Sequence, residues 1–159
     1  MSDRTRILTG DCTVSFDGPR ERTQRGHVVI LVKPDRTVLV HDADGYQPVA
    51  WLTRPDEVTV EHDSEGFSLD AAADDQELSV RSHDATETDD YPVSAAGIPV
   101  GDCPLCTGPL VRTRGEIRCL DCAEQYGLPS GATVLDSCCP DCGLPQMRVE
   151  RGAAFELCV

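Results

Sequence analysis

The C-terminal third of the sequence holds two cysteine pairs whose spacing suits one metal ion. Cys103 and Cys106 are followed, after twelve residues, by Cys119 and Cys122. Each C-x-x-C pair can form a tight turn that directs two thiolates at one ion, and the intervening residues suit a hairpin that returns the second pair to the first. Four thiolates at about 2.3 Å complete the tetrahedral shell of Zn²⁺ and leave no position for water. The sequence therefore predicts a structural zinc ion rather than a catalytic one.

A second run of cysteines repeats the first after 36 residues. The pattern Cys-Pro-x-Cys that begins at Cys103 recurs at Cys139, and a proline and an arginine follow both copies at the same offset. Cys158 falls near the counterpart of Cys122. We therefore expect two copies of one small module.

The second module has three of the four thiolates that such a site uses. Cys139, Cys142 and Cys158 can bind one ion together. The fourth ligand stays open between the adjacent Cys138, a carboxylate such as Glu156, a water molecule and a residue beyond the last one given. A degenerate, metal-free copy is a further alternative. The sequence thus predicts one zinc ion per chain and leaves a second open.

The cysteine distribution also bears on the cellular compartment. The nine cysteines come mainly as C-x-x-C pairs, and the first hundred residues contain only Cys12. This pattern favours reduced metal ligands over a secreted disulfide scaffold. No apolar run follows a basic start, and no stretch reaches membrane-spanning length. We expect a cytoplasmic protein with no membrane partner.

The chain is strongly acidic, with a net charge of −14. It has 18 Asp, 10 Glu and 13 Arg, and its only lysine is Lys33. This composition resembles that of haloarchaeal proteins, which work in a salt-rich cytoplasm. An acidic charge usually argues against nucleic-acid binding. At molar salt, however, the Debye length is only about 3 Å, so local contacts decide what binds.

Short strand patterns fill the first eighty residues. The apolar run 28–32 and the run 37–41 flank Pro34-Asp35-Arg36, which predicts a hairpin. Strands spaced about ten residues apart predict a small β-barrel or sandwich. Three further segments alternate between apolar and polar residues, at 57–61, 66–69 and 77–81.

These observations predict a mainly β chain in three parts. A β domain spans 1–81, and an acidic linker without periodicity spans 82–97. The cysteine-rich region, 98–159, contains a complete module over 98–131 and an incomplete one over 132–159. The net charge is −11 over the first 97 residues and −3 over the rest. The nearly neutral cysteine-rich region is thus the less surprising place for a nucleic-acid contact.

Residues 103–159 resemble the C-terminal zinc-finger modules of type IA topoisomerases, which bind single-stranded DNA. The resemblance implies DNA binding here as well. The sequence departs from those modules because a downstream fourth cysteine is missing and only Tyr126 and Phe155 offer rings for stacking on bases. The motifs that carry the resemblance are Cys103-Pro104-Leu105-Cys106-Thr107-Gly108-Pro109-Leu110, Arg114-Gly115, Leu128-Pro129-Ser130-Gly131, Cys139-Pro140-Asp141-Cys142-Gly143-Leu144-Pro145 and Glu156-Leu157-Cys158.

Residues 11–81 resemble the N-terminal DNA-binding domain of the NucS family of archaeal mismatch and branched-DNA endonucleases. The resemblance implies a small β-barrel-like sandwich that binds single strands and forms dimers. Two motifs carry it, Gly26-His27-Val28-Val29-Ile30-Leu31-Val32-Lys33-Pro34-Asp35 and Gly45-Tyr46-Gln47-Pro48-Val49-Ala50-Trp51.

The NucS resemblance implies roles for four residues. Trp51 would stack on a base, and Arg20 or Arg22 would contact the DNA backbone. Tyr46 stands where the family often has a basic residue, and it could add a second stacking surface. Ala50 replaces the family's Asn. The alternative for Trp51 is a place in the core, where a sole tryptophan is commonly found.

The sequence also lacks the residues that a nuclease of this family uses. The cysteine modules stand where the metal-binding carboxylates and the Glu-x-Lys motif would follow, and no other catalytic motif is present. We therefore expect a non-catalytic protein that binds single-stranded or branched DNA in repair, recombination or topology control. The alternative is an adaptor whose β domain forms a homodimer and whose zinc ribbons dock on a DNA-repair or topoisomerase-type enzyme.

Overall fold

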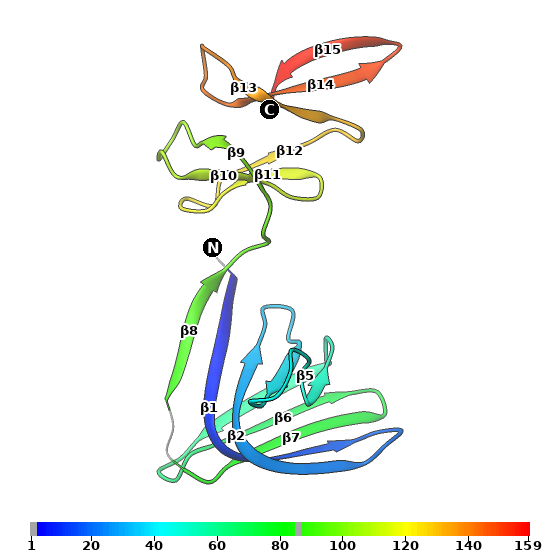
Figure 1. Cartoon of the computed structure of the whole chain (residues 1–159), viewed down its shortest axis with the longest axis vertical. Helices are drawn as coiled ribbons and strands as arrows, with labels where there is room; N and C mark the ends of the chain where they lie inside the picture. Colours follow the sequence, from blue (N-terminus) through cyan, green and yellow to red (C-terminus); the bar gives the residue numbers. More distant parts are fainter. Residues whose placement is uncertain (1–2, 85–86) are drawn as a thin grey trace. The chain divides into compact units, whose positions relative to one another are not determined.

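The computed structural model describes residues 3–84 and 87–159, which divide into two compact units. One unit spans Asp3–Val93 and the other Ser94–Val159. Within these described residues the regular structure consists of strands without helices (Figure 1). The predicted mainly β class is confirmed. Over the same residues, no helix is long and apolar enough to cross a membrane.

One curled sheet forms the N-terminal unit. Its strands pair in the order β4-β3-β2-β1-β7-β6-β5, and β8 pairs with the free edge of β1. The end strand β4 lies against β6 and β7, so the sheet closes on itself. The strands are β1 (Asp3–Asp17), β2 (Arg22–Val32), β3 (Val38–His41), β4 (Ala50–Leu52), β5 (Glu57–His62), β6 (Phe67–Ala73), β7 (Gln76–Ser82) and β8 (Thr88–Val93).

The core of this unit follows from side-chain alternation along the strands. On β2, Val28 and Ile30 are buried while Val29 between them faces out. The predicted hairpin is confirmed, because β2 pairs with β3 across a turn closed by the Lys33 N–H on the Thr37 carbonyl at 2.9 Å. The buried residues are Leu8, Cys12, Val14, Val28, Ile30, Val38, Val40, Ala50, Leu52, Phe67, Leu69, Ala71, Leu78 and Val80.

Strand β8 corrects the expected linker over 82–97. Residues 88–93 pair antiparallel with the first half of β1, from Thr88 opposite Leu8 to Val93 opposite Asp3. The reason is the length of β1, whose N-terminal half would otherwise leave backbone N–H and C=O groups unpaired on the side that β7 does not reach. Most of β8 is solvent-exposed. Its sequence therefore shows no apolar alternation, although each of its residues has a partner on β1.

Two small sheets form the C-terminal unit. The first has the order β12-β11-β10-β9 and the second β13-β14-β15. They fall within the predicted modules 98–131 and 132–159. The strands are β9 (Ile98–Asp102), β10 (Pro109–Arg112), β11 (Glu116–Cys119), β12 (Gln125–Gly127), β13 (Thr133–Cys138), β14 (Pro145–Arg151) and β15 (Ala153–Cys158).

Both modules contribute to one small core. Its buried members are Cys103, Leu110, Ile117 and Cys119, all from the first module. Val134, Leu144 and Val159 of the second module pack against it. The second module is therefore supported by apolar contacts with the first as well as by its own cysteines.

Candidate metal centres and nucleic-acid interface

The four cysteines of the first module converge on one point. Their Sγ atoms all lie within 4.8 Å of one another. The distance from Cys103 Sγ to Cys122 Sγ is 3.8 Å, and that from Cys106 Sγ to Cys119 Sγ is 3.4 Å. Four sulfurs bound at about 2.3 Å in a tetrahedron lie about 3.8 Å apart, whereas a disulfide is about 2.05 Å long. The predicted set therefore forms a closed site that could hold a metal ion.

Backbone hydrogen bonds shape the turn that carries the first two ligands. The Thr107 N–H donates to the Cys103 carbonyl at 2.8 Å, and the Gly108 N–H donates to Cys106 Sγ at 3.4 Å. Thr107 has a φ of 63°, in the left-handed region that a β-branched residue rarely adopts. This conformation belongs to a turn that directs the sulfurs of Cys103 and Cys106 toward the same point.

The same turn recurs in the second module, which confirms the internal repeat. The Gly143 N–H donates to the Cys139 carbonyl at 2.9 Å, and Gly143 has a φ of 75°. Both residues stand 36 positions after their counterparts in the first module. Glycine removes the strain that Thr107 carries at the equivalent position.

Three cysteines converge in the second module. The Sγ atoms of Cys139, Cys142 and Cys158 lie within 4.8 Å of one another, and among the described residues Cys138 and Glu156 do not join them. The Glu156 carboxylate instead accepts a hydrogen bond from Arg148 at 2.9 Å. This cluster could also hold a metal ion, with fewer protein ligands than the first.

Strand register corrects the counterpart of Cys158. Leu110 pairs with Cys119 in the first module, and Gln146, 36 residues after Leu110, pairs with Cys158 in the second. Cys158 therefore corresponds to Cys119 and not to Cys122. The β14–β15 hairpin is three residues longer than the β10–β11 hairpin, so a fixed offset no longer applies beyond it.

In each cluster, one thiol has a lowered pKa. Burial raises the pKa of Cys119, but nearby backbone N–H groups, that of Cys122 first, outweigh it and lower this pKa to about 7. The backbone N–H of Cys142 and then the thiol of Cys158 lower the pKa of Cys139 to about 7. Because the thiolate is the form that binds metals, Cys119 and Cys139 reach this form near neutral pH, whereas the pKa of Cys106 and that of Cys158 are raised to about 12.

A cavity of about 340 Å³ in the N-terminal unit brings together three of the four predicted DNA-contacting residues. Trp51, Arg20 and Arg22 line it together with Phe16 and Gln76. The two arginines are its only charged lining residues, in a chain with 28 carboxylates. The cavity thus combines an aromatic surface with local positive charge.

Trp51 is not a core residue. Along β4 the buried Ala50 and Leu52 point inward, so Trp51 between them points outward and is 54% exposed. Tyr46 is 88% exposed and is not part of the cavity lining. The structure therefore places Trp51 with the arginines and leaves Tyr46 apart from them.

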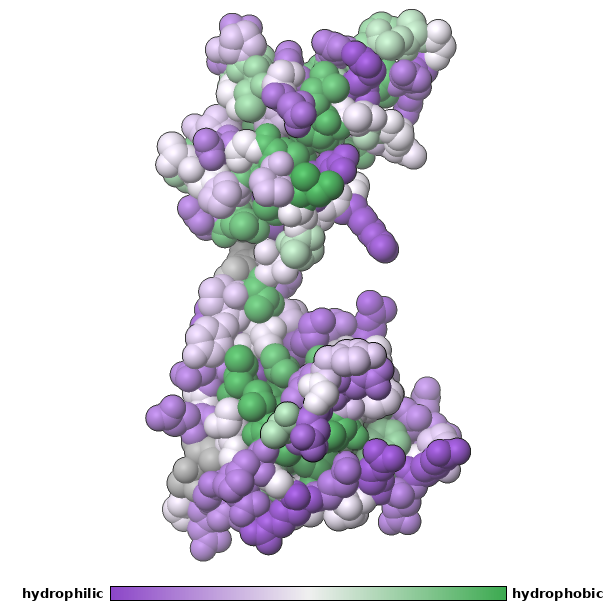
Figure 2. All heavy atoms as spheres, viewed as in Figure 1, coloured by the Kyte–Doolittle hydropathy of each residue, from purple (hydrophilic) through white to green (hydrophobic). Residues whose placement is uncertain are grey.

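The rest of the cavity wall was not predicted from the sequence. Val14, Phe16 and Gln24 come from β1 and β2, and Gln76 begins β7. The alternation of side chains along β1 could have predicted that Val14 and Phe16 share one face, but only as core residues. Figure 2 shows hydrophilic side chains over much of the visible face of the N-terminal unit.

Comparisons with known proteins agree with this division of the chain. Residues 2–94 match the family model of the endonuclease NucS N-terminal PH-like domain. Over 61 residues the chain is 44% identical to DNA topoisomerase 1 of Methanothermobacter thermautotrophicus (strain Delta H). This match covers 33% of the chain and only 8% of the topoisomerase.

Solved structures of endonucleases are similar at lower levels. EndoMS in its apo form shares 22% identity with a TM-score of 0.49, over 58% of this chain and 44% of that one. The EndoMS–dsDNA2 complex shares 20% identity with a TM-score of 0.47. A repair endonuclease from Pyrococcus abyssi shares 18% with a TM-score of 0.41. The last two matches cover 79% of this chain and 63% of each of those.

Proposed function

The chain belongs to the family of the endonuclease NucS N-terminal PH-like domain, and from this premise we propose that it is a non-catalytic, zinc-containing protein that binds single-stranded or branched DNA. The observation that carries the proposal is the cavity beside Trp51. The lining combines an exposed aromatic ring with two arginines and contains no carboxylate. Proteins bind single strands with such groups, because bases stack on the ring and arginines contact the phosphates.

The two kinds of group contribute differently to binding. A base that stacks on Trp51 gains roughly 1–3 kcal/mol without any sequence readout. Arg20 and Arg22 can each contact a phosphate, and that contribution weakens as salt rises. Duplex DNA keeps its bases stacked inside, so the exposed Trp51 favours single strands and branch points.

The cysteine clusters support zinc as the metal. Four thiolates at tetrahedral spacing suit Zn²⁺ and leave no position for a substrate, so the ion in the first module is structural. We expect at least one zinc per chain in protein purified without chelator, measured by elemental analysis. A zinc content below half an equivalent in well-folded protein would contradict the assignment.

The DNA site is tested by fluorescence anisotropy with single-stranded, forked and duplex DNA at low and molar KCl. Trp51→Ala should weaken single-strand binding by about 1–3 kcal/mol and leave the melting temperature nearly unchanged. Tyr91→Ala, which removes another half-exposed ring, is the matched control and should not change binding. Tyr46→Ala removes the second ring that was predicted to stack, and it should weaken single-strand binding less than Trp51→Ala does. The proposal fails if the wild type binds no single strand at any salt concentration.

The non-catalytic part of the proposal has its own test. Apart from Lys33 the chain has no lysine for the Glu-x-Lys motif of the related nucleases, and cysteine modules follow β8 directly. We expect no cleavage of single-stranded, forked or mismatched DNA with Mg²⁺ or Mn²⁺. Nuclease activity that co-purifies with this chain over several columns would contradict the non-catalytic assignment.

One observation favours docking on a partner protein as a second candidate function. Leu105 and Leu120 each stand inside a C-x-x-C turn of the first module, and they are 70% and 46% exposed. Apolar side chains in this position suit contact with a larger enzyme. A chain that binds no DNA, but forms a homodimer in sedimentation experiments, would favour this candidate.

A further inference from the structure

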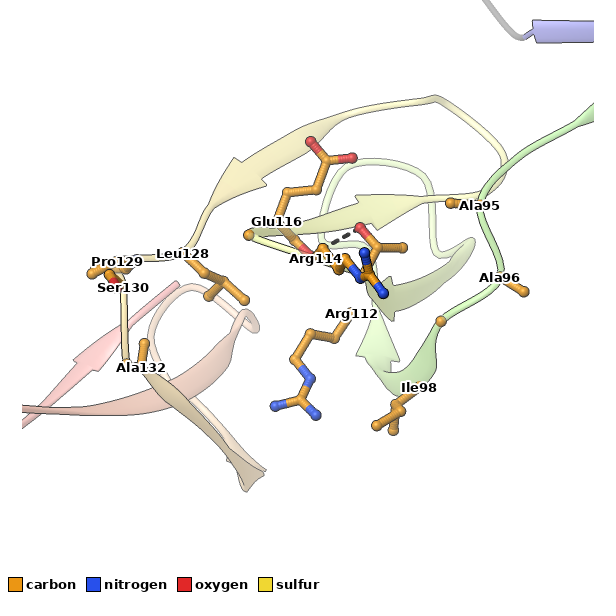
Figure 3. Close-up of a pocket in the computed structure, with 14 residues that line it drawn as sticks. Ala95, Ala96, Ile98, Arg112, Arg114, Glu116, Leu128, Pro129, Ser130 and Ala132 are labelled. Atoms are coloured by element: carbon orange, nitrogen blue, oxygen red, sulfur yellow. Dashed lines mark hydrogen bonds between the residues drawn. The ribbon is translucent and has the colours of Figure 1, made fainter. Parts of the chain in front are cut away.

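A second hollow, of about 1220 Å³, lies on the first cysteine module. Its walls are residues 95–98, the turn between β10 and β11, and residues 128–132. Figure 3 shows Arg112 between Ile98 on one side and Leu128 and Ala132 on the other. The hollow is far larger than a single inorganic anion needs.

The charge in this hollow differs from that of the chain as a whole. Arg112 and Arg114 line it, and within the described residues neither makes an ion pair, whereas six other arginines do. The one carboxylate in the lining belongs to Glu116, and its oxygen lies 3.4 Å from Arg118 Nε. Two arginines are therefore free to bind an anion here, although the chain carries a net charge of −14.

The backbone holds the two arginines in place. Arg112 ends β10, and Arg114 lies in a turn where the Thr113 N–H donates to the Glu116 carbonyl at 2.9 Å. The Leu128 N–H donates to the Gly115 carbonyl at 2.8 Å, which fastens the opposite wall to this turn. Gly97 approaches the Arg112 carbonyl so closely that any Cβ would clash with it. Gly97 on one wall and Leu128 on another are therefore both in backbone contact with the segment that carries the two arginines.

We propose that this hollow binds the phosphodiester backbone of a DNA strand through Arg112 and Arg114, as a second site that works differently from the cavity beside Trp51. The lining contains no aromatic ring for a base to stack on, so charge contributes more here than stacking does. Guanidinium groups bind phosphate oxygens through paired, charge-assisted hydrogen bonds. The identity of the ligand as DNA rests on the proposed function, whereas the anion site rests on the arginines alone.

Two probes separate the sites: a labelled oligothymidylate and an abasic strand of the same length, which keeps the phosphates and lacks the bases. Binding is measured over KCl concentrations at which the circular dichroism spectrum is constant. The variant Arg112→Gln/Arg114→Gln should bind the abasic strand clearly more weakly than the wild type, and the binding that remains is expected from Arg20 and Arg22. It should also lower the log–log salt slope on oligothymidylate by about 1.4, which corresponds to two phosphates.

The control variant is Arg148→Gln, which removes an arginine of the second module that is already paired with Glu156. It should bind both probes like the wild type, and all variants should keep their zinc content. Trp51→Ala should weaken oligothymidylate binding and leave abasic binding unchanged. If Trp51→Ala changes the binding of neither probe, the proposed stacking on Trp51 is wrong. The abasic binding of the double variant still tests whether Arg112 and Arg114 bind phosphates. The inference is wrong if the double variant binds the abasic strand as tightly as the wild type does. It is also wrong if the wild type does not bind the abasic strand.

Discussion

The two units of this chain are held together by different physical means. The N-terminal unit has fourteen buried apolar residues in one cluster, whereas the core of the C-terminal unit has four, of which two are cysteines. A unit of about sixty residues with so small a core is marginal without a metal, a disulfide or a partner. Apolar burial therefore specifies the first fold, whereas the second needs a further contribution, which metal ions bound at the two cysteine clusters could supply.

Loss of the first metal site should have the largest effect. Cys103→Ser removes one of four ligands, and structural zinc contributes roughly 10–16 kcal/mol to the folding of such modules. We expect residues 98–159 to unfold while the amide signals of residues 3–93 stay in place in two-dimensional NMR spectra. Cys138→Ser, at an exposed cysteine outside both clusters, should change neither zinc content nor spectrum. If residues 98–159 of Cys103→Ser stay folded without zinc, their fold does not depend on the metal.

Loss of the second cluster should have a smaller and more local effect. Cys139→Ser leaves the four ligands of the first site intact, so β9–β12 should stay folded and keep their zinc. We expect at most one equivalent of metal to be lost and only β13–β15 to lose protection in hydrogen exchange. If instead both modules unfold together, the shared contacts of Val134 and Leu144 bind them into one cooperative unit.

A core substitution in the N-terminal unit should give the opposite pattern. Leu69 is fully buried, so Leu69→Ala should lower the free energy of unfolding of this unit by about 2–5 kcal/mol. Zinc content should not change. Leu105→Ala, at an exposed leucine of the other unit, should alter stability by less than about 0.5 kcal/mol. Denaturant unfolding measures both, and a loss of zinc in Leu69→Ala would show that the units depend on each other.

Surface ion pairs should matter least. The Asp70 carboxylate lies 2.8 Å from Arg81, and both side chains are about half exposed, so solvent screens the pair. Burial raises the pKa of Asp70, but hydrogen bonds from Arg81 and Ser79 outweigh it and lower this pKa below 3.8. A carboxyl group whose pKa is lowered by folding stabilises the folded state at pH values above its pKa in the unfolded state. This stabilisation disappears as the pH falls through its pKa in the folded state.

Arg81→Gln should therefore raise the pKa of Asp70, as followed by NMR titration, and cost about 0.2–1 kcal/mol at pH 7. The difference from wild type should shrink below pH 3.8. A cost that persists at low pH would assign the effect to lost packing of the arginine stem rather than to charge.

Local signals could be predicted from the sequence, and long-range pairings could not. The β2–β3 hairpin follows from two apolar runs around Pro34, and the first metal site follows from cysteine spacing alone. In contrast, β8 has exposed side chains, and only the unpaired edge of β1 explains it. The counterpart of Cys158 depended on three additional residues in a hairpin, which a fixed offset cannot detect. The hollow beside Arg112 is formed by three segments that no local pattern connects.

The pairing of β8 with β1 also has a mechanical consequence. The chain leaves the N-terminal unit at Val93, so a pull from residue 94 acts on the last pair of the β1–β8 ladder and opens it one pair at a time. Because β8 is largely exposed, its release removes no residue from the buried cluster. Its six residues would extend the tether by about 20 Å. Backbone hydrogen bonds and the exposed Arg6–Asp90 ion pair hold this strand, so its release can lengthen the connection between the two units while the fold that carries Trp51 stays intact.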